Sequence, residues 1–419
     1  MACATAVASL APASAQAGKS MELAISDDPV FLARHYYDRD RAFQNARELG
    51  VTRLRVFVNW AGVMGKQREA TEPPAEPTYY WGIYEELIDA AARAGIRVQL
   101  NLTGPAPRYA TGDKNLGSTR PDPARYAEFA RAAATRFKGR VDRYTLWNEP
   151  NHDGWLRPSA EAPKLYRALY AAGYGAIKGA DPGAAVFFGE TAPYHGKRAM
   201  APLTFLRRTL CLTNRYRIDK KCLAGMPAET RGMLRTDGYA HHPYDFRNAP
   251  SYKFKGNDNV TIGTLSRLTS ALDKAARAKA LATPRGRAPF VYLTEFGYFA
   301  TGERAQIPEN KRVKYLPKAY AIAQRNPRVK QMLHYGLAAP PPSYPGAAFD
   351  FGLVNTDGSA RPTYAPLARW VAGAIKRGQV VAPGGPIGMP AAQPGADPPG
   401  EAPPPEEEEP PLFPPIPFP

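Results

Sequence analysis

Two short motifs carry acidic residues in a setting where they could act as catalysts. Each is an apolar, strand-like run that ends on a glutamate: Glu149 closes the run that begins at Thr145, and Glu295 closes the run that begins at Tyr292, about 145 residues later. Hydrolysis of a glycosidic bond needs two carboxyl groups beside that bond, one to donate a proton and one to act as nucleophile or base. The two motifs together therefore predict a pair of catalytic carboxyl groups.

The two glutamates need opposite protonation states. A general acid such as Glu149 must hold a proton near neutral pH, which partial burial or a second carboxylate can bring about. Trp147 and Trp155 could provide apolar surroundings. Glu295 must be ionised to attack a carbon atom, so it needs hydrogen bonds or a cation nearby. The competing interpretation, in which Asn148 and Glu149 merely cap a helix, is disfavoured by the tryptophan before them and the proline behind.

The two motifs are part of a regular alternation of strand-like and helix-like segments. The strand-like segments are spaced by about 30 to 53 residues, which suits repeated strand–helix units with some long loops. Eight such segments are expected: Glu22–Ile25, Arg53–Asn59, Arg97–Leu102, Asp142–Asn148, Ala185–Glu190, Asp237–His242, Phe290–Glu295 and Lys330–Gly336.

The segments between the strands have the periodicity and the end signals of helices. Arg41–Leu49 ends before Gly50 and Glu85–Ala94 ends before Gly95, as helices with a C-terminal glycine do. Alternating strands and helices predict a parallel sheet, and eight strands with acids at their ends favour a closed barrel over an open sheet. No Gly-x-Gly-x-x-Gly run follows the first strand, which argues against a dinucleotide site. The expected fold class is α/β, a (β/α)8 TIM barrel over residues 21–380.

The strand-end motifs resemble those of a known group of enzymes. Asn148-Glu149-Pro150 is similar to the fourth-strand Asn-Glu motif of the clan A glycoside hydrolases, the retaining (β/α)8 enzymes that include families 5 and 39, and Glu295 resembles their seventh-strand nucleophile. The resemblance runs from about residue 22 to about residue 377. It implies an O-glycosidase with Glu149 as acid/base and Glu295 as nucleophile, acting on an equatorial β-type bond or its α-L counterpart. It does not imply which sugar is cleaved.

The same resemblance suggests residues that support the catalytic pair. Asn148 corresponds to the asparagine that bonds the sugar 2-hydroxyl, and Arg55 corresponds to the arginine below the nucleophile. The run from His242 to Tyr244 resembles a sixth-strand His-x-Tyr whose phenol bonds the nucleophile. An ordinary edge charge remains the alternative for Arg55. Glu190, which ends the fifth strand, is expected to accept a hydrogen bond from a sugar hydroxyl or to be structural.

Aromatic residues after the predicted strands suggest a groove for sugar rings. Sugars stack on flat rings, and five aromatics at strand-to-helix loops favour a saccharide groove over simple packing. These are Trp60, Tyr109, Trp155, Tyr194 and Tyr298. Many relatives have a tryptophan at the end of the eighth strand, where this chain has Tyr335. The resemblance therefore does not identify the aromatic residue on which the innermost sugar ring would stack.

No metal or other cofactor is expected. His241, His242 and Asp245 could be interpreted as metal ligands, but the chain has only six histidines and offers no further ligand at a useful spacing. The remaining pair of cysteines after the leader, Cys211 and Cys222, lies in a charged stretch between strands. We expect a disulfide there, with two free thiols as the alternative.

The two ends of the chain differ from the barrel in composition. Residues 1–20 are rich in alanine, and an Ala-x-Ala pattern ends at Ala17, so they are expected to be a secretory signal peptide or a disordered leader. Residues 381–419 are rich in proline and glutamate, which predicts a disordered tail. With the cysteine pair, the leader predicts a secreted or cell-envelope protein.

The net charge of +17 bears on possible partners. A basic surface favours anionic partners such as acidic polysaccharide, whereas a GC-rich genome would produce the same excess of arginine without a binding role. No nucleic-acid motif and no transmembrane segment is apparent, and a monomer is expected. A carbohydrate substrate is expected throughout. A transglycosylase with the same residues, and an inactive carbohydrate-binding barrel, are the alternatives to a hydrolase.

Overall fold

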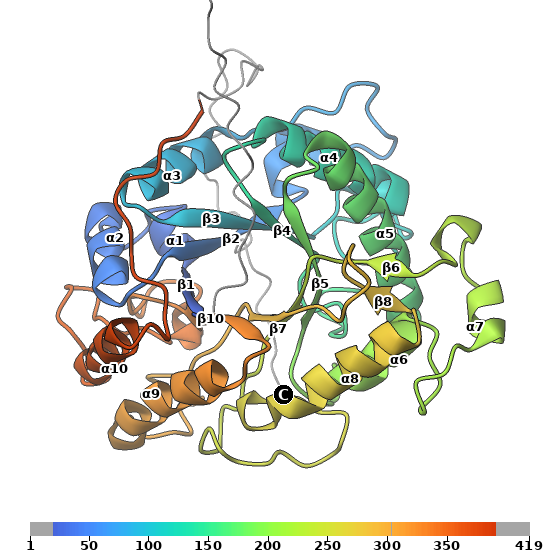
Figure 1. Ribbon diagram of the computed structural model, residues 1–419. Coiled ribbons are helices and arrows are strands. Elements are labelled where there is room, and N and C mark those ends of the chain that lie inside the picture. Colours follow the sequence, from blue (N-terminus) through green and yellow to red (C-terminus); the bar gives the residue numbers. More distant parts are fainter. Residues whose placement is uncertain (1–19, 303, 391–419) are drawn as a thin grey trace, which may run out of the picture.

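A computed structural model, which describes residues 20–302 and 304–390, shows a closed parallel barrel ringed by helices (Figure 1). The strands follow the order β1-β10-β9-β7-β5-β4-β3-β2 around the barrel. Their bounds are β1 Glu22–Ser26, β2 Arg53–Asn59, β3 Arg97–Thr103, β4 Arg143–Leu146, β5 Ala185–Thr191, β7 Gly238–His241, β9 Val291–Leu293 and β10 Val329–Tyr335. The predicted (β/α)8 barrel is confirmed.

Each predicted strand is present, and the differences lie at the strand ends. β4 ends at Leu146 and β9 ends at Leu293, two residues short of the predicted ends at Asn148 and Glu295. The backbone leaves the regular strand conformation there, since Trp147 has a φ of 64°. The residues that follow each strand are therefore free to turn their side chains into the barrel mouth.

The barrel helices begin and end close to the predicted signals. Asp38 and Asp122 cap α2 and α4 by accepting backbone N–H groups, and Gly50 and Gly95 adopt the positive φ of helix-terminating glycines. In the described part of the chain no helix is long and apolar enough to cross a membrane. The α-helices are α1 Asp28–Phe31, α2 Arg39–Glu48, α3 Gly82–Arg93, α4 Pro123–Arg136, α5 Ala162–Ala180, α6 Pro202–Thr209, α7 Lys220–Ala224, α8 Leu265–Arg277, α9 Glu309–Arg325 and α10 Tyr364–Lys376. Short 3-10 helices are η1 Gly62–Glu69, η2 Arg108–Ala110, η3 Ala228–Thr230, η4 Ile262–Thr264 and η5 Ala347–Phe349.

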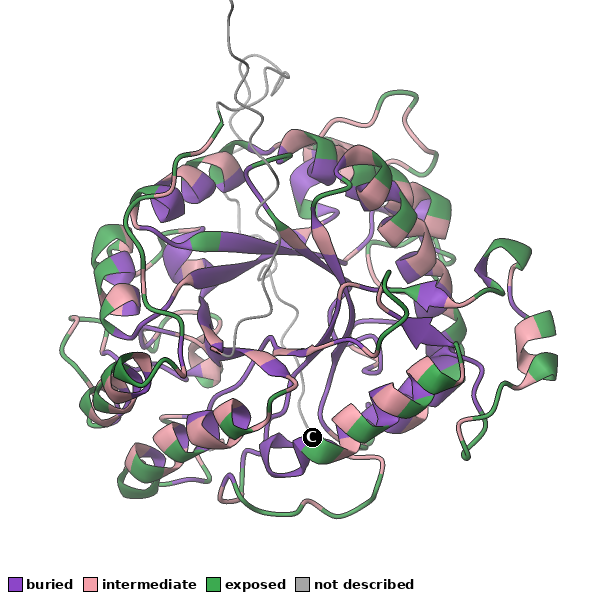
Figure 2. Ribbon diagram, viewed as in Figure 1, coloured by how far each residue is buried: buried purple, intermediate pink, exposed green. Residues whose placement is uncertain are grey.

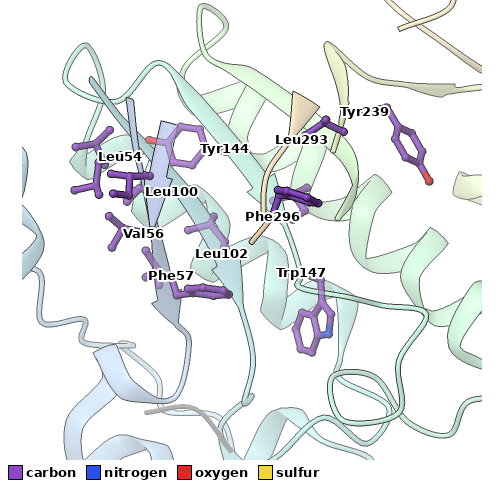
Figure 3. Close-up of a cluster of buried hydrophobic side chains, with 14 of the residues drawn as sticks. Leu54, Val56, Phe57, Leu100, Leu102, Tyr144, Trp147, Tyr239, Leu293 and Phe296 are labelled. Atoms are coloured by element: carbon purple, nitrogen blue, oxygen red, sulfur yellow. The ribbon is translucent and has the colours of Figure 1, made fainter. Parts of the chain in front are cut away.

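The core lies between the strands and the inner faces of the helices. The strands are buried almost throughout and the helices are buried on the side that faces the sheet (Figure 2). Apolar side chains of β2 and β3, such as Val56 and Leu100, gather with Tyr144 and Phe296 in this core (Figure 3). Strands covered on both sides read as continuous apolar runs, which is why their presence was visible in the sequence.

A disulfide joins Cys211 and Cys222, as predicted, with their Cα atoms 5.4 Å apart. It closes the loop between α6 and α7, on the periphery of the barrel. Nearby, two short strands, β6 Leu234–Arg235 and β8 Leu281–Ala282, form a separate parallel pair. The disulfide therefore links two points of a peripheral segment that contributes no strand to the barrel.

Loss of this disulfide is expected to lower the free energy of unfolding by about 2 to 3 kcal/mol, because a closed loop of this length restricts the unfolded chain by that amount. The measurement is urea unfolding of the wild type and of the Cys211→Ser/Cys222→Ser variant, with dithiothreitol added to each as a control. The reductant should lower the stability of the wild type alone. Two alkylatable thiols in native wild-type protein would contradict the expectation.

The segment after α10 differs from the prediction of a tail that starts at residue 381. Val381 donates its backbone N–H to Met21, and Ile387 donates to Ala92 at the end of α3, both within 3.0 Å. Arg47 on α2 donates to the carbonyl of Gly384. Residues 381–390 thus pack along α2 and α3, so the prediction is wrong for them. The rest of the predicted tail and nearly all of the predicted leader lie outside the described residues.

Candidate active site

The two predicted catalytic glutamates meet at the mouth of the barrel, beyond the C-terminal ends of β4 and β9. A carboxylate oxygen of Glu149, one of Glu295 and a ring nitrogen of His242 all lie within 4.8 Å of one another. The residues are nearly inaccessible, with Glu149 1% and Glu295 6% exposed. Parallel strands bring their C-terminal ends to one face of a barrel, which is how residues about 145 positions apart in sequence come into contact.

The backbone is strained where β4 and β5 end in this site. Glu149 has a φ of 33° and Glu190 a φ of 50°, in a region that residues with a side chain rarely adopt. Such conformations cost on the order of 1 to 3 kcal/mol each and gather at functional sites. The strain turns both carboxyl groups toward the barrel axis. Sequence reasoning missed it, because nothing in the residue types demands a positive φ.

Arg55 on β2 connects the buried acids. Its guanidinium donates to Glu295 Oε1 at 3.0 Å, to Glu190 Oε2 at 2.8 Å and to Asn148 Oδ1 at 2.9 Å. Arg55 is fully buried, and its planar fork can serve several acceptors at once. The contact to Asn148 fixes the amide so that its NH2 group is the part left to donate to a ligand. The alternative, an edge charge, is wrong for Arg55.

His242 lies between three carboxyl groups. Its Nδ1 is 3.0 Å from Glu149 Oε1 and 3.6 Å from Glu295 Oε2, and its Nε2 is 2.5 Å from Glu190 Oε2. Burial by itself lowers the pKa of His242, but the surrounding carboxylates outweigh burial and raise the pKa to about 10. The ring is therefore a cation at neutral pH and donates a hydrogen bond from each nitrogen.

Glu295 and Glu190 are held in different electrostatic states. Burial raises the pKa of Glu295 above its ordinary value, although His242 and Arg55 oppose that shift. Burial also acts on Glu190, but there Arg55 and His242 prevail and lower the pKa to about 2. Tyr244 donates its hydroxyl hydrogen to Glu295 Oε2 at 3.1 Å. The same two cations thus lower the pKa of Glu190 below its ordinary value, whereas burial outweighs them at Glu295.

The buried cluster of Arg55, His242 and three glutamates is electrically neutral when it carries one carboxyl proton. Arg55 and His242 contribute two positive charges, and three carboxyl groups face them, so the buried cluster is neutral when one carboxyl group is protonated. Uncompensated buried charge is costly, which favours that single proton. Glu149, His242 and Glu295 are also residue types that bind metals.

Several supporting residues escaped sequence reasoning. Thr294 donates its hydroxyl to Glu190 Oε2 at 3.1 Å, and Asn101 on β3 donates to Thr145 at 2.8 Å. The hydroxyl of Thr103 accepts the backbone N–H of Asn148 at 3.1 Å. Asn101 and Thr103 alternate with apolar residues of β3, and Thr294 directly follows β9; that placement was the available signal. Glu190 is completely buried, and its Oε2 accepts hydrogen bonds from Arg55, His242 and Thr294.

Three of the predicted sugar platforms belong to the core. Trp60 is fully buried and stacks on Phe129, with ring centroids 5.6 Å apart. Tyr298 is fully buried, and Tyr109, 7% exposed, points its hydroxyl at Met64. The prediction is therefore wrong for these three, because their ring faces are covered by other side chains. Their position after a strand did not distinguish a lining residue from a packing residue.

The other predicted aromatics are placed closer to the site. Trp155 is 4% exposed and lies parallel to Phe57 at 6.1 Å, beside a small cavity of the barrel mouth. Tyr335 is half-buried at the end of β10, and its pKa is raised by burial and by the charge of Glu295. Tyr194 is half-buried and stacks on Phe254. Trp155 and Tyr335 thus flank the acids, whereas the tryptophan of many relatives is replaced by a phenol.

A larger cavity of about 710 Å³ lies beside the loop that carries Glu149. That loop is joined to the cavity wall by backbone hydrogen bonds, from Met200 to Asn151 and from Asp153 to Arg198, each at 2.8 Å. The lining combines small and apolar residues with basic side chains and one acid, Asp258. It includes Ser159, His195, Lys197, Thr204, Arg208 and Asn259.

An eight-stranded barrel with two buried glutamates after its fourth and seventh barrel strands defines the clan A type of glycoside hydrolase. A family model described as cellulase (glycosyl hydrolase family 5) matches residues 16–328. The chain belongs to this family. A search of curated protein sequences found no match.

Solved structures share the fold. A family 39 glycoside hydrolase from Bacteroides cellulosilyticus WH2 superposes with a TM-score of 0.62 at 19% identity, over 84% of this chain and 64% of that one. A β-xylosidase from Caulobacter crescentus CB15 gives 0.53 at 18% identity, over 84% and 68%. An exo-β-1,4-mannosidase from an Opitutaceae bacterium gives 0.51 at 18%, over 86% and 60%. The chain thus spans about two thirds of the length of these proteins, and the likeness concerns the fold.

Proposed function

We propose that the protein is a retaining O-glycosidase in which Glu149 is the acid/base and Glu295 the nucleophile. The observation that carries this proposal is the approach of the two glutamates to within 4.8 Å at their carboxylate oxygens. Retaining enzymes hold their carboxyl groups about 5 to 5.5 Å apart, whereas inverting enzymes leave about 6.5 to 9.5 Å for a water molecule. The approach of the nearest carboxylate oxygens to within 4.8 Å supports the retaining arrangement.

The first step joins the sugar to the protein. The ionised carboxylate of Glu295 attacks the anomeric carbon, the bond to the leaving oxygen breaks, and Glu149 gives its proton to that oxygen. Glu149 Oε1 is already bonded to His242, whereas Oε2 is buried without a hydrogen-bond partner. Oε2 is therefore the oxygen available to the leaving group.

The second step returns the protein to its starting state. Glu149, now ionised, takes a proton from a water molecule, and the oxygen of that water attacks the anomeric carbon and releases Glu295. Arg55 and Tyr244 stabilise the carboxylate that is released, because both donate hydrogen bonds to it. The amide of Asn148 is positioned to bond the sugar 2-hydroxyl, a contact that strengthens in the oxocarbenium-like transition state.

We propose an oligo- or polysaccharide as the substrate. The loop that carries Glu149 is bonded to the wall of a cavity of about 710 Å³, which is large enough for further sugar units. The lining residues Lys197 and Arg208 would favour an acidic saccharide there. The disulfide suits an oxidising compartment, which supports a secreted or cell-envelope location for the reaction.

The proposal predicts that hydrolysis retains the anomeric configuration. The wild type is incubated with a panel of 4-nitrophenyl β-D-glycosides and α-L-arabinosides, and proton NMR identifies the anomer that appears first. The expected first product has the configuration of the substrate, because two displacements at the same carbon cancel. An inverted first product would contradict the nucleophile role of Glu295. No hydrolysis across this panel and a polysaccharide panel would contradict the hydrolase itself.

A further inference from the structure

A small cavity lies at the barrel mouth near the C-terminal ends of β2 and β3. Its volume is about 30 Å³, which holds one water-sized group and not a sugar ring. The residues that line it come from α1 and the turn after it, from the ends of β2 and β3, from α3, and from the loops after β4 and β10. They include Asp28, Phe57, Asn59, Tyr84, Thr103 and Trp155.

Two lining residues have a buried polar atom without a partner. Asp28 is 7% exposed; its Oδ2 accepts the backbone N–H of Phe57 at 2.9 Å, but its Oδ1 is buried and accepts no hydrogen bond. The indole Nε1 of Trp155 is likewise buried and donates to no acceptor. Nearly all buried polar atoms in native proteins are bonded, so an unpaired acceptor and an unpaired donor at one cavity indicate a missing occupant.

Phe57, which lines the cavity, connects it to the catalytic cluster through Arg55. The Arg55 guanidinium lies over the ring of Phe57, 4.3 Å from its centroid, and the same guanidinium bonds Glu295. Burial raises the pKa of Asp28 to about 7, and the charges of Arg55 and Glu295 contribute to that value. Asp28 is therefore close enough to the catalytic cluster to sense its charges, although it is bonded to none of its members.

We propose that this cavity receives one hydroxyl group of the sugar whose anomeric carbon faces Glu295, with Asp28 Oδ1 as its acceptor and Trp155 Nε1 as its donor. A hydroxyl is the sugar group that can donate to one atom and accept from the other. A carboxylate could only accept, and beside Asp28 it would be repelled. Asp28 is thus a residue that selects an uncharged, hydroxyl-bearing sugar unit. The inference rests on the proposed glycosidase function.

The test compares the best aryl glycoside of the panel with its monodeoxy derivatives, using the wild type, Asp28→Ala and Trp155→Phe. In the wild type, one deoxy derivative should lose at least about 100-fold in kcat/KM, because a site built to bond a hydroxyl rejects the analogue that lacks it. In Asp28→Ala, the parent and that derivative should react at nearly equal rates. Trp155→Phe keeps a flat ring but removes the N–H donor. It should reduce the ratio of kcat/KM between the parent glycoside and that deoxy derivative.

Asp28→Asn is the matched variant if Asp28→Ala fails to fold. It keeps the shape and one oxygen acceptor, so a reduced preference for the same hydroxyl is expected. An unchanged ratio for every deoxy derivative in the folded variants would overturn the inference and would show that the cavity holds water or nothing. Failure of the wild type to hydrolyse any aryl glycoside would instead count against the proposed function.

Discussion

Replacement of Glu295 by alanine is expected to lower kcat for an aryl glycoside by roughly 10⁴-fold or more, because the nucleophile acts as one unit with its partners. Sodium azide should then restore turnover, since the small anion can occupy the space left by the carboxylate. Azide attacks the face that Glu295 used, and one displacement inverts the configuration. The product to look for by NMR is therefore the inverted glycosyl azide.

Glu149→Ala gives the contrasting result. A dinitrophenol leaving group needs no protonation, so the first step should remain fast for such substrates and become slow for poor leaving groups. Azide should accelerate release of the glycosyl–protein intermediate, and the glycosyl azide should have the retained configuration. Glu190→Ala removes a third buried glutamate and is the matched control; azide should not rescue it. If the products of the two catalytic variants are exchanged, the two roles are reversed.

Replacement of Arg55 by leucine is expected to produce the largest loss of stability. At pH 7 it should lower the free energy of unfolding by about 3 to 5 kcal/mol, because it leaves buried carboxylates without their cation. Glu190 loses the partner that helps to hold its pKa at about 2. A carboxyl group with a lowered pKa stabilises the fold above its unfolded pKa, and this contribution disappears as the pH falls toward the folded pKa. The difference in free energy of unfolding between the wild type and Arg55→Leu should therefore shrink as the pH falls below about 4.5.

Urea unfolding at several pH values measures this effect. Arg97→Leu is the matched control, because Arg97 is also a strand arginine with an acidic partner, Asp142, but half of its side chain is exposed. Arg97→Leu should lower the free energy of unfolding by no more than about 1 kcal/mol. Arg55→Leu combined with Glu190→Leu should recover part of the loss, since it removes the unpaired charge. A loss below about 1 kcal/mol in Arg55→Leu would show that the guanidinium does not hold the cluster together.

The strands and the catalytic pair could be predicted from the sequence for a local reason. A strand covered on both faces is a continuous apolar run, so a charged residue at its end stands out, as Glu149 and Glu295 do. The same contrast marked Glu190, whereas Arg55, which lies inside β2, was indicated by the family resemblance. The cysteine pair stood out because few alternatives for pairing existed in the chain.

The aromatic platforms could not be predicted in this way. Trp60 and Trp155 both follow a strand, yet one is enclosed by the rings of α4 and the other borders a cavity. The difference lies in what the neighbouring loops cover, which local sequence does not encode. The packing of residues 381–390 escaped prediction for a similar reason, because their backbone bonds are made to α2 and α3 at distant positions in the chain.

The sequence by itself determined the alternation of strands and helices and the residues that end each strand, because periodicity and residue type are local properties. Only the tertiary structure decided the charge state of the site. His242 could be a ligand, a base or a cation by type, and the three carboxyl groups around it raise its pKa to about 10. The unpaired oxygen of Asp28 is likewise visible only when the barrel closes around it. Electrostatic interactions depend on distance in space and on burial, and both are set when the strands meet.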